Sequence, residues 1–172
     1  MSYKNENMKM IELHENGLDI QFRIRENGVV ELADFSSQEV KKAVMEPKDD
    51  ICYPAVEIHR SGTGSLNMHA YKNNINQSSV DFVYENHELK AQAGGKELEI
   101  VMISPEKLKA VYHMRLFDGV PAVQTWTEII NEGSEDQGLT YVSSFMYQGI
   151  SRGGEKPYYK KTDIYEIGRA HV

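Results

Sequence analysis

The chain lacks the sequence features typical of disulfide-stabilised, membrane-spanning and nucleic-acid-binding proteins. It contains one cysteine in 172 residues, so it has no internal disulfide framework, and this scarcity suits the reducing cytoplasm. No apolar run approaches the roughly 20 residues of a membrane-spanning helix, and the polar first residues lack the apolar core of a signal peptide. The net charge of −7 disfavours nucleic-acid binding. We therefore expect a cytoplasmic domain whose partners include neither a membrane nor a nucleic acid.

Motifs that would hold a metal ion, activate a nucleophile or cradle a phosphate are also absent from the sequence. The histidines show no His-x-His or His-x-x-x-His spacing; they are His14, His59, His69, His87, His113 and His171. Cys52 has no nucleophile signature around it, and the glycines form no strand–GxGxxG–helix unit. We therefore predict that the chain holds no metal and no cofactor.

The longest regular pattern is an alternation of apolar and polar residues that begins after Lys107. It places every second residue on one apolar face: Leu108, Ala110, Tyr112, Met114 and Leu116. A period of two is typical of a half-buried strand. Asp118-Gly119 then favours a two-residue hairpin loop with positive φ at both positions, followed by a return strand from Val120 to Ile130.

A third strand is expected beyond this hairpin. Asn131-Glu132-Gly133 predicts a turn into Gly138–Tyr147, which would complete an antiparallel meander. Trp126, the only tryptophan, stands in the middle strand of the meander. Its ring could stack on a sugar, but at a central strand position packing in the core is the stronger interpretation.

Comparable strand signals recur along the rest of the chain. Alternation predicts strands at residues 8–15, 18–24, 29–35, 55–60, 80–84, 88–93, 96–103 and 161–167. Turns are expected at Asn27-Gly28, Glu85–His87 and Gly94-Gly95. One helix is predicted over Ser36–Pro47, because Ser36 and Glu39 fit a capping box and proline stops a helix. Together these signals favour an all-β, antiparallel sandwich with at most one or two short helices.

Carboxylates are the remaining candidates for chemistry, since a glycosidase needs two of them at a defined separation. Asp49 and Asp50 are the most interesting pair, because they stand in a loop that leads into a predicted strand, where sites are often built. An exposed acidic turn explains the same pair without any function. The residues alone therefore indicate a β domain with no self-evident active site.

The central meander carries a familiar pattern of residues. It consists of Tyr112–Val123, Asn131–Gly133 and Tyr141–Phe145, and upstream of it stand Tyr53–Ile58 and Ser61-Gly62. In this order the segments resemble the N-terminal domain of glycoside hydrolase family 36, which contains the microbial α-galactosidases. The resemblance runs from about Ile20 to the end of the chain.

The resemblance implies a β-supersandwich of the galactose-mutarotase type, which in the full enzyme precedes a (β/α)8 barrel and a small C-terminal β domain. Residues 1–172 would then be a single N-terminal domain, a fragment of a longer enzyme that lacks its catalytic barrel. The family's nucleophile and acid/base are barrel aspartates in a retaining mechanism, so we expect no catalytic residue in this chain and no activity from it alone. The implied partners are an α-galactoside, the missing barrel and further copies of the chain in a homo-oligomer.

One substrate-binding residue also follows from the resemblance. Several family members have an Asp-aromatic-Arg-x-Pro-Ala segment whose loop caps the galactose pocket, often in a neighbouring subunit. The matching run here is Asp50–Ala55, so Asp50 would accept hydrogen bonds from sugar hydroxyls. Ile51 and Cys52 stand where the family has the aromatic residue and the arginine.

Two other functions fit a sandwich of this kind. One is a stand-alone carbohydrate-binding module. The other is a mutarotase-type epimerase, although the chain is short for that fold and no His/Glu pair stands out in the sequence. The resemblance favours the hydrolase domain, which would assist assembly and rim the substrate pocket.

Overall fold

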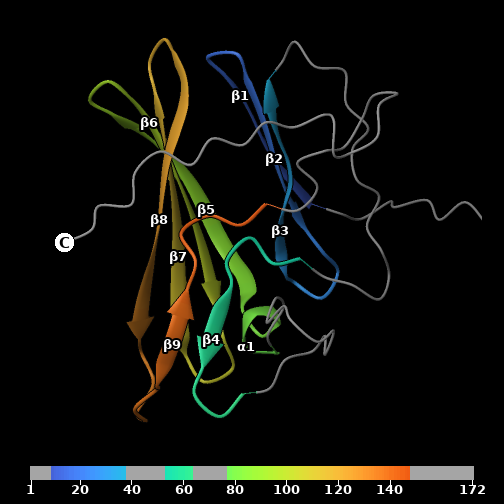
Figure 1. Cartoon of the computed structure of the whole chain (residues 1–172), viewed down its shortest axis with the longest axis vertical. Helices are drawn as coiled ribbons and strands as arrows, with labels where there is room; N and C mark the ends of the chain where they lie inside the picture. The colour runs from blue at the N-terminus through green and yellow to red at the C-terminus, as the bar shows by residue number, and fades with distance from the viewer. Residues whose placement is uncertain (1–8, 38–52, 64–76, 148–172) are drawn as a thin grey trace, which may run out of the picture.

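The computed structural model describes residues 9–37, 53–63 and 77–147 of the chain (Figure 1). These residues form nine strands and one short helix: β1 (Lys9–Glu15), β2 (Leu18–Ile24), β3 (Val30–Ser37), β4 (Ile58–Arg60), α1 (Gln77–Val80), β5 (Val83–Gln92), β6 (Gly95–Ile103), β7 (Leu108–Phe117), β8 (Val120–Asn131) and β9 (Leu139–Val142). Every strand pairing is antiparallel. The predicted all-β antiparallel class is confirmed. Among the described residues no helix is long and apolar enough to cross a membrane.

Three sheets build the sandwich. The strands β1-β2-β3 form one sheet, β5-β6-β7-β8 form a second, and β4-β9 form a two-stranded ribbon. Figure 1 shows the first sheet beside the second, with the ribbon near the lower end of both. Within residues 9–37, 53–63 and 77–147, a single hydrophobic core cluster includes residues from all three sheets, so these sheets form one packed unit.

The core forms where the alternating faces of the two larger sheets meet. Phe22 of β2 is fully buried and Tyr112 of β7 is 1% exposed, and their rings meet edge to face with centroids 5.7 Å apart. Burying a side chain of this size stabilises the fold by roughly 1.5–3 kcal/mol. Burial also raises the pKa of the Tyr112 hydroxyl above its usual range. The residues that alternation assigned to the inner face of β7 are all buried: Leu108, Ala110, Tyr112, Met114 and Leu116.

The β7–β8 hairpin is confirmed, but its turn differs from the predicted one. Gly119 has a φ of 69°, whereas Asp118 does not have a positive φ. The pairing changes from Leu116–Val123 to Phe117–Val120, so β8 carries extra residues beside the turn. A bulge next to the loop lets glycine alone supply the left-handed residue.

Two predicted connections are wrong. Strand β9 pairs with β4, not with β8, so the three strands do not form a simple meander. Glu85–His87 is not a turn, because β5 runs through these residues with a register shift between Tyr84 and Asn86. The shift accommodates one extra residue in β5. This residue interrupts the alternation of apolar and polar side chains, and the interruption was interpreted as a turn. Val80, predicted to begin a strand, ends α1 instead.

The predicted helix Ser36–Pro47 is also incorrect at its start, since Ser36 belongs to β3. Residues 38–47 and the predicted strand at 161–167 lie outside the described residues. The other predicted strands correspond to observed ones, but the segments at 55–60 and 138–147 are shortened to β4 and β9, and those at 80–84 and 88–93 belong to the single strand β5.

Gly95 provides a test of the packing between β6 and β7. A Cβ at this position would stand 1.9 Å from the backbone oxygen of Leu116, whereas one at Gly94 would meet nothing within 4 Å. We expect Gly95→Ala to lower the free energy of unfolding by about 3 kcal/mol or more, since backbone must move. Gly94→Ala, the control, has only positive-φ strain of about 1–2 kcal/mol. Urea unfolding followed by tryptophan fluorescence measures both, and equal losses would contradict the packing described.

Candidate functional site

The one residue assigned to sugar binding, Asp50, lies outside the described residues, as do Asp49 and Cys52. The structure does describe where the chain goes directly after them. The backbone N–H of Tyr53 donates to the Glu31 carboxylate at 2.9 Å, and the N–H of Ala55 donates to the Val30 carbonyl at 2.7 Å. The segment that follows Asp50 is therefore attached to β3.

Glu31 is a buried charge that serves as this attachment point. It is 2% exposed and accepts hydrogen bonds from Arg23 Nε at 3.0 Å and Arg25 Nη1 at 3.2 Å. Arg23 and Glu31 stand opposite each other across β2 and β3, so the strand register brings the two charges together. A buried carboxylate with two guanidinium partners and a backbone donor is well satisfied, and it holds Tyr53 in one place.

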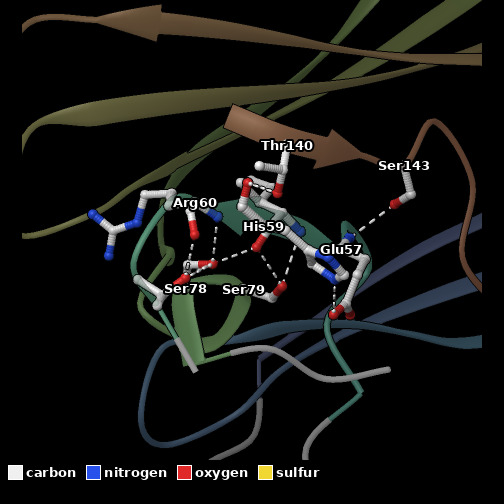
Figure 2. Close-up of polar contacts among 9 residues, drawn as sticks. Glu57, His59, Arg60, Ser78, Ser79, Thr140 and Ser143 are labelled. Atoms are coloured by element: carbon white, nitrogen blue, oxygen red, sulfur yellow. Dashed lines mark hydrogen bonds and ion pairs between the residues drawn. The ribbon is translucent and has the colours of Figure 1, made fainter. Parts of the chain in front are cut away.

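Further along the same segment, buried serine hydroxyls hold the backbone of β4 (Figure 2). Ser79 Oγ accepts from the Ile58 N–H at 2.8 Å, and Ser78 Oγ donates to the Ile58 carbonyl at 2.5 Å. From the other side, Ser143 Oγ accepts from the Glu57 N–H at 2.8 Å. These hydroxyls are committed to backbone groups, so they hold α1 and the residues after β9 against β4 and are not set up as nucleophiles.

Arg60, the last residue of β4, forms ion pairs at the end of this ribbon. Its guanidinium contacts the carboxylates of Glu106 at 2.7 Å and Asp81 at 3.2 Å. Burial alone would raise the pKa of the Glu106 carboxyl, but hydrogen bonds, that from Arg60 foremost, lower it below its usual range. Glu106 is therefore ionised at neutral pH and acts as an ion-pair partner.

Two His/Glu pairs, which the sequence did not reveal, come together in the structure. His59 Nε2 of β4 lies 3.0 Å from Oε1 of Glu57, the residue before that strand, and His113 Nδ1 lies 2.9 Å from Glu97 Oε1 across β6 and β7. In each pair the two side chains touch directly.

The second pair belongs to a larger polar cluster on the outer face of the four-stranded sheet. Glu99 Oε1 lies 4.0 Å from His113 Nδ1, and Glu128 Oε2 lies 3.8 Å from His113 Nε2. Trp126 stacks on the His113 ring with centroids 4.6 Å apart and an interplanar angle of 5°. The prediction that Trp126 packs in the core is wrong, because its position on β8 faces away from Tyr112 and toward the outer face.

The cluster was missed because its members are linked only by strand register. Glu97 and Glu99 alternate onto one face of β6, and His113 onto the outer face of β7. Only the pairing of Glu99 with His113 across the two strands brings them together. Spacing along the sequence contains no sign of that pairing.

The segments that carry the family resemblance lie next to each other, although they are far apart in the sequence. Ile58 pairs with Val142 and His59 with Tyr141 where β4 meets β9, and the β7–β8 hairpin forms the adjoining sheet. No protein-family model and no curated protein matches the chain. The family remains a proposal that rests on these segments.

The attachment at Glu31 can be tested by removing its charge. We expect Glu31→Gln to lower the free energy of unfolding by about 3 kcal/mol or more, because it removes the charge of one partner of a buried ion pair. The matched control is Glu132→Gln, which breaks the partly exposed Lys109–Glu132 pair and should cost less than about 1 kcal/mol. Urea unfolding measures both, and a loss at Glu31 no larger than at Glu132 would refute the role of this ion pair.

Proposed function

We propose that this chain is the N-terminal β-supersandwich domain of an α-galactosidase-like glycoside hydrolase. The observation that carries the proposal is the placement of the resembling segments. Tyr53–Ile58 and Tyr141–Phe145 meet at the β4–β9 ribbon, and the first of them follows Asp50 closely in the sequence. The buried Glu31 of β3 accepts a hydrogen bond from the backbone of Tyr53, the first residue of that segment.

In this proposal the domain does not break the glycosidic bond. Two aspartates of a (β/α)8 barrel perform the retaining double displacement, and this chain contributes to assembly and to the rim of the pocket. Asp50 accepts hydrogen bonds from sugar hydroxyls, which are stronger when the acceptor is charged. The barrel and further copies of the chain are the partners.

The first test uses the 172-residue chain itself. It should release no nitrophenol from an aryl α-galactoside, since both catalytic aspartates belong to the barrel. It should also give no saturable heat with galactose in calorimetry, because a rim without its pocket buries little of the sugar. Turnover that disappears on substitution of a residue within this chain would overturn the proposal.

The second test concerns Asp50 in the intact hydrolase. We expect Asp50→Asn to raise KM for an α-galactoside by about tenfold with kcat little changed, as for a residue that binds ground state and transition state alike. The neighbouring Asp49→Asn is the matched control and should change KM by less than about twofold. Equal effects of the two substitutions, or a loss of kcat with Asp50→Asn, would contradict a rim contact.

A second candidate function is a stand-alone carbohydrate-binding module, and the position of Trp126 favours it. The ring lies on the outer face of the sheet among carboxylates, and aromatic rings beside polar groups suit sugar recognition. Saturable galactose binding by the chain alone that is lost in Trp126→Ala would select this candidate. Retention of binding in that variant would exclude Trp126 as its platform.

A further inference from the structure

The outer face of the four-stranded sheet gathers three metal-ligand side chains from two neighbouring strands. Glu97 and Glu99 come from β6 and His113 from β7, and one donor atom of each lies within 4.8 Å of the others. His113 Nδ1 is 2.9 Å from Glu97 Oε1 and 4.0 Å from Glu99 Oε1. Bonds of about 2.0–2.2 Å to a tetrahedral zinc ion place donor atoms roughly 3.4 Å apart. The observed separations bracket that value.

These ligands stand on regular strands, so their positions are set by the backbone. Glu99 is paired with His113 across β6 and β7, and Glu97 stands two residues from Glu99 on the same face. Glu97 is 8% exposed and His113 is 7% exposed, so both are held by their neighbours. Trp126 stacks on the imidazole and fixes the plane of the ring. A site on sheet strands is more rigid than one on loops.

The second nitrogen of His113 provides an independent observation. Nε2 is buried and has no hydrogen-bond partner within the described part of the chain. It points toward Glu128 Oε2, which is 3.8 Å away. When a metal takes Nδ1, the imidazole carries its proton on Nε2, and a histidine ligand usually donates that proton to a carboxylate. A small movement of the exposed Glu128 would complete this arrangement.

We propose that Glu97, Glu99 and His113 form a binding site for a divalent transition-metal ion such as Zn²⁺, with Glu128 positioning the histidine. One imidazole nitrogen and two carboxylates suit Zn²⁺, Ni²⁺ or Co²⁺ better than Mg²⁺, which prefers oxygen ligands alone. Solvent would complete the coordination, because the site lies on a sheet face. The three ligands are not residues of the segment that carries Asp50, and the metal site does not depend on the proposed hydrolase function.

The charged neighbours of the site predict which substitution would change its affinity for a metal ion. Lys90 of β5 is paired with Glu99 and also lies 3.7 Å from Glu88, so the ion must displace its ammonium group. Arg115 of β7 stands opposite Glu97 but donates to the Ala93 carbonyl. Lys90 is therefore the cation that competes with the metal, and its removal should strengthen metal binding.

The only tryptophan of the chain reports on the site directly, because it stacks on a ligand. We expect titration of the chain with Co²⁺ to quench Trp126 fluorescence with one ion per chain, and Zn²⁺ to compete. His113→Gln and Glu97→Gln should each weaken binding by about tenfold or more, while Lys90→Gln should tighten it. His59→Gln, which removes the other His/Glu pair, is the matched control and should leave binding unchanged.

Circular dichroism of each variant checks that it is folded, so that a loss of binding reports on the ligands. Absence of saturable quenching by Co²⁺ up to about 1 mM in the folded chain would overturn the proposal. So would binding that survives His113→Gln and is lost in His59→Gln, since this would move the ion to β4. Quenching by Mg²⁺ equal to that by Co²⁺ would refute the assigned class of ion.

Discussion

The antiparallel register of β7 between β6 and β8 is the constraint on which the rest of the structure depends. It directs Tyr112 and its alternate neighbours into the core and His113 to the outer face. Because side chains alternate with a period of two, a shift of one residue would exchange the two faces. The core contact with Phe22 and the polar cluster around Glu97 and Glu99 therefore follow from the same pairing. Stability and any chemistry on this sheet are linked through one strand.

The opposite sheet has a comparable arrangement at its edge. The register of β2 and β3 places Arg23 beside Glu31, and this buried pair receives the backbone of Tyr53. The Glu31 carboxylate would be costly to bury alone, but two arginines and one backbone N–H satisfy it. Because these hydrogen bonds are directional, they set the orientation of the backbone at Tyr53. The segment that begins at Tyr53 and leads into β4 is thereby joined to the main sandwich.

Local patterns in the sequence predicted the regular strands but not their long-range partners. The alternation in β6 and β7 and the glycines at the hairpins were sufficient for the all-β class and for most of the buried face. The bulge at Glu85, the pairing of β9 with β4 and the outward position of Trp126 were not predicted. Each depends on which strand lies beside which, and a single sequence contains no direct signal of that.

The two candidate sites likewise differ in whether the sequence alone could reveal them. Asp50 was found by resemblance and lies outside the described residues, whereas the cluster of Glu97, Glu99 and His113 became visible only through register. Sequencing the reading frame that encodes the chain tests whether it is one domain of an α-galactosidase-like hydrolase, as proposed. Beyond Val172 we expect a (β/α)8 barrel with two aspartates at the carboxyl ends of its strands. A stop codon directly after Val172, or a following domain without such a barrel, would contradict it.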